Sequence, residues 1–201
     1  MTKVTPSQVR ELRDRTGAGM MDCKRALEEA DGDVTRAVDI LRERGQAQAA
    51  KKAGRAVSEG LVTSYIHPGG RVGVLLEINC ETDFVANTGD FQELARNLAM
   101  HIAASQPRWV SREEVPEATL AHEREVLRRE AESSGKPAAI IDKMVEGRVQ
   151  RFLQERCLLE QPYVRDPDHT VGDVVQEHIA RLGENIQVRR FQRYERGEQL
   201  D

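Results

Sequence analysis

The stretch from residue 72 to residue 105 constrains the fold most, because a strand pattern gives way to a helix pattern within it. Apolar residues first recur at every second position and so share one face of a β-strand: Val72, Val74, Leu76, Ile78 and Cys80. Apolar residues with helical spacing follow: Phe91, Leu94, Leu98 and Ile102. The residues between them therefore connect a strand to an amphipathic helix, which is a place where a rigid scaffold presents side chains outward.

This connection contains an acidic residue next to a large ring. Residues 79–87 read Asn-Cys-Glu-Thr-Asp-Phe-Val-Ala-Asn. The local pattern leaves two interpretations open. In the first, Phe84 packs into the core and Asp83 helps the turn or the helix to start. In the second, both side chains face outward toward a partner.

Composition excludes several classes of function. A chain of 201 residues with 32% charged and 39% apolar residues suits one or two folded domains. A formal net charge of -4 and an aromatic content of 4% argue against a general nucleic-acid binder. Because no apolar run approaches the roughly 20 residues that a bilayer requires, we expect no membrane span.

The residues that carry most enzyme chemistry are scattered. The chain contains no phosphate-binding GxxxxGK[ST] loop, no GxSxG and no HExxH pattern. Cys80 with Glu81, Asp83 and His67 is a conceivable thiol site, although nothing in the spacing supports it. We therefore expect no metal, no cofactor and no catalytic side chain. An odd number of cysteines without a CxxC pair or a signal peptide fits a reducing cytoplasm.

Residues 1–45 are predicted to form a bundle of three short helices. Thr5 begins a capping box for the first helix, and Gly17 suits its C-terminal cap. The second helix is expected from about residue 20 to residue 30, and Asp33 caps the third, which stops at Gly45. The expected inward positions of the second helix are Met20, Ala26, Leu27 and Ala30.

The rest of the chain predicts an α+β fold with an antiparallel sheet packed against helices. Residues 46–57 are Ala- and Lys-rich and are interpreted as a partly helical linker, with phosphate contact by its basic residues as the alternative. Residues 58–201 form the expected core and dimerisation domain, with an exposed helical segment near 111–135 that opens on a Ser111 capping pattern. Strands are expected at 61–66, 71–80 and 185–196.

Two long stretches resemble the translation elongation factor Ts family. One is Leu-Arg-Asp-Arg-Thr-Gly-Ala-Gly-Met-Met-Asp-Cys-Lys-Arg-Ala-Leu-Glu-Glu-Ala-Asp-Gly-Asp at 12–33, and the other is Asn-Cys-Glu-Thr-Asp-Phe-Val-Ala at 79–86. Shorter stretches resemble the family in the same order, at 100–107, 135–137, 143–148, 161–164 and 184–190. Long members carry two related core halves. This chain resembles the short form with one, which suggests that a homodimer replaces the missing half.

The resemblance implies a guanine nucleotide exchange factor for elongation factor Tu. The N-terminal bundle then docks on the GTPase domain through positions matched by Arg13, Met20 and Met21. The Thr-Asp-Phe loop enters between partner helices beside the magnesium and phosphate site. His101 matches a further contact position. The loop positions are Thr82, Asp83, Phe84 and Val85, with Asp83 and Phe84 as the intruding pair.

Several alternatives stay open beside this interpretation. The bundle alone also fits a ubiquitin-associated-type binding module without exchange activity. A lone histidine such as His101 on an apolar helix face is more often a core or boundary residue. The alternating strand at 185–196 either pairs with a second copy of the chain or lies within its own sheet, with its arginines guarding the edge.

Overall fold

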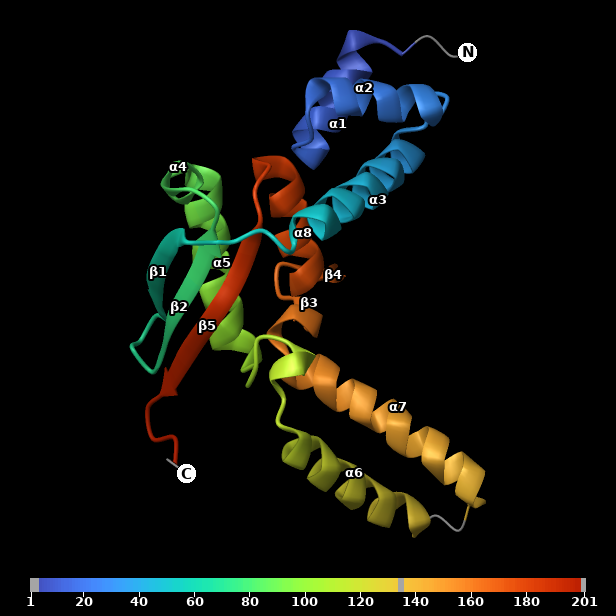
Figure 1. Ribbon diagram of the computed structural model, residues 1–201, viewed down its shortest axis with the longest axis vertical. Coiled ribbons are helices and arrows are strands. Elements are labelled where there is room, and N and C mark those ends of the chain that lie inside the picture. Colours follow the sequence, from blue (N-terminus) through green and yellow to red (C-terminus); the bar gives the residue numbers. More distant parts are fainter. Residues whose placement is uncertain (1–3, 134–135, 200–201) are drawn as a thin grey trace. The chain divides into compact units, whose positions relative to one another are not determined.

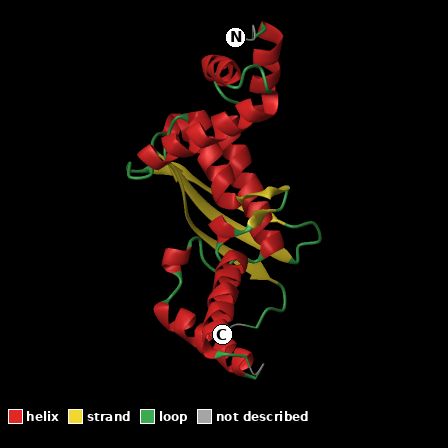
Figure 2. Cartoon of the chain, turned by 90° about the vertical axis from the view of Figure 1, so that its right-hand side faces the viewer, coloured by secondary structure: helices red, strands yellow, loops and turns green. Residues whose placement is uncertain are grey.

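The computed structural model describes residues 4–133 and 136–199, so the ends of the expected bundle and core and residues 134–135 of the expected exposed segment lie outside the described residues. The predicted α+β fold is confirmed: helices come first, followed by an antiparallel sheet with further helices (Figures 1 and 2). The helices are α1 (Pro6–Thr16), α2 (Met20–Glu29), α3 (Val34–Lys52), α4 (Asp83–Ala86), α5 (Gly89–Ser105), α6 (Glu117–Glu132), α7 (Ala138–Arg156) and α8 (Val171–Leu182). The strands are β1 (Glu59–Ile66), β2 (Val72–Cys80), β3 (Pro162–Tyr163), β4 (Asp166–Thr170) and β5 (Ile186–Glu195), and two 3-10 turns are η1 (Arg112–Glu114) and η2 (Leu158–Glu160).

The strands form two sheets. The larger has the order β1-β2-β5, so β1 and β5 are its edge strands, and the smaller is the antiparallel pair β3-β4. The alternation predicted for β2 is confirmed, because Val74, Leu76, Ile78 and Cys80 are all buried. The helical spacing in α5 is confirmed as well: its four predicted core residues, from Phe91 to Ile102, are at most 1% exposed.

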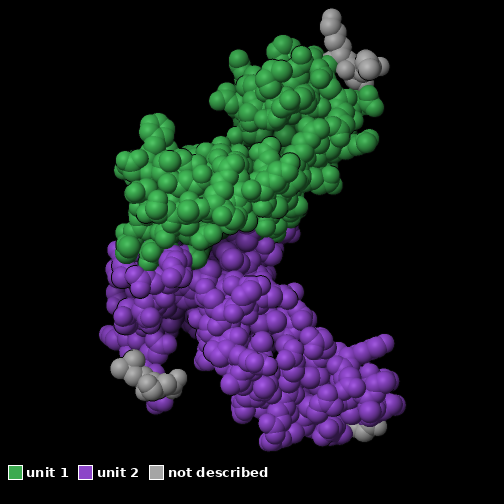
Figure 3. Space-filling model, in the orientation of Figure 1, with its two compact units in different colours: residues 1–62, 77–95, 173–188 green, residues 63–76, 96–172, 189–201 purple. Residues whose placement is uncertain are grey.

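The chain forms two compact units (Figure 3). Residues 1–62, 77–95 and 173–188 make up the first, and residues 63–76, 96–172 and 189–201 make up the second. The first unit therefore contains the N-terminal helices, α4 and the connection that precedes β5. The predicted division into bundle, linker and core stays a prediction.

The N-terminal helices begin where their capping residues predict. Thr5 forms a capping box at α1, Gly17 ends that helix in the left-handed region at φ 68°, and the Asp33 side chain caps α3. Seven buried residues form the core between the three helices: Val9, Leu12, Cys23, Ala26, Leu27, Ala30 and Ala37.

The predicted end of the third helix at Gly45 is wrong, because α3 continues to Lys52. A Cβ atom on Gly45 would lie 3.3 Å from the Cβ of Ala180 in α8, so this glycine allows two helices to approach closely. Alanine-rich sequence beyond it favours continuation of the helix. The Lys52 Nζ also donates to the Ile179 carbonyl at 3.5 Å. Most of the segment interpreted as a linker is therefore helical and lies against α8.

In the second unit, α6 and α7 pair as a helical hairpin (Figure 1). Arg128 and Asp142 form an ion pair at 2.7 Å, and Arg148 and Glu130 form another at 2.8 Å. The pairing buries Ala131, Ile141, Val145, Val149 and Leu153. The segment expected to be helical contains α6, but its predicted start at Ser111 is wrong. Ser111 precedes the short turn η1 without a capping bond, and α6 begins only after Pro116.

Candidate partner-binding site

The connection after β2 folds into the single turn of helix α4. Thr82 is its N-cap, with its Oγ1 accepting from the backbone N–H of Val85 at 3.4 Å. Val85 and Ala86 are buried, at 6% and 8% exposure. Successive side chains on a helix point about 100° apart, so burial of these two turns the preceding pair away from the core. The two buried residues anchor the turn, and Asp83 and Phe84 lie on its outer side.

Phe84 is the most exposed of the large apolar side chains in the described part of the chain, at 81%. The interpretation that places this ring in the core is therefore wrong. Burying a phenylalanine side chain contributes about 1.5–3 kcal/mol, so an exposed ring on an anchored turn forgoes that stabilisation. An exposed aromatic side chain is available as an anchor for a partner. By contrast, the buried side chain of Val85 does not meet the expectation of a direct partner contact.

The structure contradicts the hypothesis of a thiol site at Cys80. The side chain is fully buried, and its Sγ donates to the Thr82 carbonyl at 3.1 Å. Burial raises the pKa of the Cys80 thiol, with a further contribution from the charge of Glu184. The protonated thiol is a poor nucleophile. Cys80 therefore holds the start of the loop and offers no reactive group.

The predicted docking residues lie on the surface of the N-terminal helices. Met20 is 43% exposed and Met21 is 64% exposed, at the start of α2. The expectation that Met20 points inward is wrong, because it lies in the first turn at the margin of the core. Arg13 is exposed in the last turn of α1. Unbranched methionine side chains adapt to a partner's surface, so this arrangement suits protein binding.

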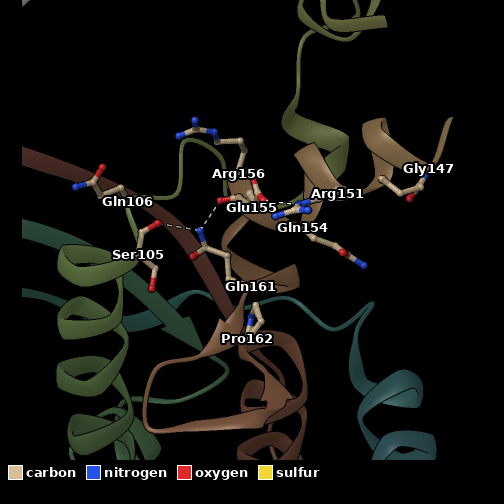
Figure 4. Close-up of a pocket in the computed structure, with 10 residues that line it drawn as sticks. Ser105, Gln106, Gly147, Arg151, Gln154, Glu155, Arg156, Gln161 and Pro162 are labelled. Atoms are coloured by element: carbon tan, nitrogen blue, oxygen red, sulfur yellow. Dashed lines mark hydrogen bonds and ion pairs between the residues drawn. The ribbon is translucent and has the colours of Figure 1, made fainter. Parts of the chain in front are cut away.

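His101 lies in the core and not on the surface. Its ring is fully buried, and its Nδ1 accepts from the backbone N–H of Val164 at 3.2 Å. Its Nε2 lies 2.9 Å from the Gln161 Oε1. The Gln161 amide nitrogen donates to the carbonyls of Ser105 at 3.1 Å and Glu155 at 2.7 Å, as Figure 4 shows. The amide oxygen is thus left to accept, and the imidazole is the neutral Nε2–H tautomer.

This environment determines both the charge and the role of His101. Burial lowers the pKa of the ring, and protonation at Nδ1 would break the bond from the Val164 N–H. The expected partner contact at His101 is not met in this structure, because the ring has no exposed surface. The alternative interpretation, a core histidine, describes it: the ring joins α5 to the segment around β3.

A pocket of about 730 Å³ is lined by residues of α7, by the end of α5 and by Gln161 and Pro162 (Figure 4). Glutamine and arginine side chains line much of it, including Gln150, Gln154 and Arg151. None of the predicted site residues lines this pocket. In residues 4–133 and 136–199, no cluster of three or more metal-binding side chains occurs, and no helix is long and apolar enough to span a membrane.

Comparison with known proteins shows the family to which the chain belongs. The family model described as Elongation factor TS matches residues 7–198. The chain belongs to the elongation factor Ts family. Elongation factor Ts of Thermoanaerobacter pseudethanolicus is 58% identical over 198 residues, which cover 98% of this chain and 97% of the relative. The homologue from Syntrophomonas wolfei is 59% identical, with 98% and 92% covered, and that from Carboxydothermus hydrogenoformans is 59% identical, with 98% and 91% covered.

Membership of this family assigns the chain to translation elongation in protein biosynthesis. The match extends over both compact units, so it includes the bundle, the loop and the C-terminal strand. The relatives named above have nearly the same length as this chain, which agrees with the resemblance to a short form.

Proposed function

We propose that the chain is a guanine nucleotide exchange factor that promotes GDP release from elongation factor Tu. The observation that carries this proposal is the outward presentation of Phe84, 81% exposed beside Asp83, on a turn anchored by two buried residues. A ring held in this way is a wedge that binds only where a partner opens to receive it.

The wedge acts on the elements of the GTPase that hold the nucleotide. Magnesium and backbone donors bind the phosphates of a GTPase nucleotide, so displacing those elements raises the rate of nucleotide release. In this proposal Phe84 supplies binding energy for the displacement, and Asp83 accompanies it beside the phosphate site. Arg13, Met20 and Met21 hold the GTPase domain while the loop enters. The chain itself supplies no covalent chemistry.

Thermodynamic linkage makes the effect reciprocal. If the chain lowers the affinity of the partner for nucleotide by some factor, nucleotide lowers the affinity of the partner for the chain by the same factor. GDP or GTP therefore expels the exchange factor, which then acts again. We propose that this cycle takes place in the cytoplasm, without direct contact to nucleic acid or membrane.

The second part of the proposal is a homodimer. In the three-stranded sheet β5 is an edge strand, and an open edge is a template for pairing with another chain. Large apolar side chains are also exposed on the strands of this sheet: Ile66 at 65%, Leu75 at 50% and Tyr194 at 64%. A closed two-fold dimer would cover this surface. Sedimentation tests it, because a single species near 22.6 kDa at all micromolar concentrations contradicts a dimer.

The release of labelled GDP from elongation factor Tu, followed by stopped-flow fluorescence, tests the exchange proposal. We expect the wild-type chain to accelerate release in a saturable manner, and excess GDP to dissociate the complex. Binding to elongation factor Tu without acceleration would instead favour a binding module of the ubiquitin-associated type. No binding at all would refute both.

A further inference from the structure

Two carboxylates connect the loop before α4 to the segment before β5. Glu184 accepts twice from one residue, through Oε2 from the Thr82 backbone N–H at 3.0 Å and through Oε1 from the Thr82 Oγ1 at 2.6 Å. In the opposite direction, the Glu81 Oε1 accepts from the Asn185 backbone N–H at 2.6 Å. We call these four residues, Glu81, Thr82, Glu184 and Asn185, the loop clamp. Its bonds are charge-assisted and so are stronger than ordinary hydrogen bonds.

Glu184 reaches the wedge through the hydroxyl group of Thr82. A hydroxyl has one proton to donate and lone pairs to accept. The Thr82 hydroxyl donates its proton to Glu184 and accepts from the Val85 N–H, the bond that caps α4. The direction of this hydroxyl therefore depends on Glu184, and the first turn of α4 depends on the hydroxyl. Phe84 lies inside that turn, so its orientation follows from the same chain of bonds.

The loop clamp also contacts the end of the N-terminal bundle. The Asn185 side chain is 1% exposed, and its amide nitrogen donates to the carbonyls of Arg55 at 2.8 Å and Ala53 at 3.4 Å. Both carbonyls belong to residues 53–55, the segment that follows α3. Glu81 lies 3.5 Å from the Arg55 guanidinium as well. Three segments of the first unit, around residues 54, 82 and 185, therefore meet at the loop clamp.

We propose that Glu184 is a positioning residue for nucleotide exchange, which fixes the wedge loop for entry into the GTPase and joins it to the end of the docking bundle. This inference rests on the exchange function proposed above. Without the clamp, the loop samples other conformations, and only a fraction of molecules is ready to bind. The apparent affinity falls by that fraction, while a bound molecule still displaces the nucleotide-binding elements.

The test compares Glu184→Gln with Thr82→Val and Thr82→Ser. Glu184→Gln keeps the size of the side chain but places an NH₂ donor opposite one of the two Thr82 donors, the backbone N–H or the hydroxyl. Thr82→Val removes the hydroxyl, and Thr82→Ser retains it. A matched control is Glu132→Gln, which changes an exposed carboxylate on α6 in the other unit. For Glu184→Gln and Thr82→Val we expect the concentration for half-maximal GDP release to rise roughly tenfold, with the plateau rate unchanged. The control should match the wild type, and Thr82→Ser should lie closer to the wild type than Thr82→Val does, because it keeps the hydroxyl that bonds Glu184.

Amide hydrogen exchange of residues 82–87 provides a second measurement that does not depend on the partner. Loss of the clamp should increase exchange in this segment, while circular dichroism and the unfolding temperature stay near wild type. Wild-type protection and wild-type kinetics in Glu184→Gln would overturn the proposal. So would a Thr82→Ser variant as defective as Thr82→Val, because the hydroxyl would then not be the relevant group.

Two further outcomes also have a definite meaning. If Glu184→Gln lowers the unfolding temperature strongly, the comparison of Thr82→Ser with Thr82→Val decides whether the hydroxyl group positions the loop. If the wild-type chain does not accelerate GDP release, the exchange function fails. Hydrogen exchange then decides by itself whether Glu184 orders the loop, so the two failures are distinguishable.

Discussion

We expect that replacing Phe84 by alanine removes the proposed wedge and leaves the fold unchanged. The ring is 81% exposed, so its loss opens no cavity in the core. A phenylalanine side chain buries about 150–250 Å² of surface in a core or an interface. Because Phe84 is 81% exposed, about 160 Å² of its surface is left for a partner to cover. At about 25 cal/mol per Å² this area corresponds to about 4 kcal/mol as an upper value, and central aromatic anchors at interfaces typically contribute about 2 kcal/mol or more.

The expected kinetic effect follows from these two values. A loss of about 2–4 kcal/mol corresponds to stimulated GDP release that is slower by about 30-fold or more. In the proposed mechanism the wedge interaction is gained as the nucleotide-binding elements move, so the plateau rate at saturating factor should fall. Stopped-flow release of labelled GDP across a range of factor concentrations measures the plateau and the half-saturation point separately. This pattern differs from that expected for Glu184→Gln, in which only the half-saturation point moves.

The control for Phe84→Ala is Ile140→Ala, which truncates another exposed apolar side chain, 46% exposed on α7. Both variants should unfold within about 0.5 kcal/mol of the wild type in urea. The reasoning would be refuted if Phe84→Ala destabilised the chain by several kcal/mol while its folded fraction released GDP at the wild-type rate. The ring would then be a core residue in solution, contrary to the exposed position.

Three further predictions concern the bundle, the two histidines with a lowered pKa and the thiols. Met20→Ala with Met21→Ala should weaken binding to elongation factor Tu by about tenfold in calorimetry without a change in unfolding, and unchanged affinity would remove α2 from the interface. Burial lowers the pKa of His101 and of His178, so the unfolded state takes up protons first. The free energy of unfolding should therefore fall as the pH drops below about 6.5, by up to about 1.4 kcal/mol per pH unit for each ring. Urea titrations at several pH values measure this dependence on pH, and His101→Gln should make it less steep. All three cysteines are free and buried, and burial raises the pKa of Cys157 to about 11. A thiol reagent at pH 8 should therefore label the native chain slowly, whereas it should label the denatured chain at all three cysteines.

The sequence predicts those features that depend on neighbouring residues. Thr5 and Asp33 cap their helices as expected, because each cap bond spans only three residues. The period of two in β2 and the helical period in α5 also identify the core correctly, since burial of one face imposes these periods. Gly45 shows the opposite case. Its local signal favours a helix end, but the close approach of Ala180, far along the chain, explains the glycine.

The candidate site is predictable in part. The family resemblance identifies the Thr-Asp-Phe stretch and the two methionines in the sequence. Their exposure, however, does not follow from the spacing of apolar residues. A helix of four residues is too short for a periodic pattern to define its buried face. The sequence therefore does not predict that Val85 and Ala86 are buried and that Phe84 points outward. His101 has the pattern of a core histidine and of a contact residue alike. Its bonds to Gln161 and Val164 assign it to the core.

Glu184 illustrates why a positioning residue escapes sequence reasoning. It lies 102 residues from Thr82 in the chain, and a lone glutamate after a helix-ending glycine has no distinctive local pattern. Its importance appears only when the cost of exposing Phe84 is considered. A ring that gains about 1.5–3 kcal/mol by burial would turn inward if the loop were free to move. The buried side chains of Val85 and Ala86 hold the turn on the core side, and the Glu184 carboxylate holds Thr82 at its start. Turning Phe84 inward would therefore break the packing of the two buried side chains and the bonds to Glu184. In the proposed exchange, the ring therefore acts on the displacement step, whereas the clamp sets the fraction of molecules in which the loop is ready to make that step.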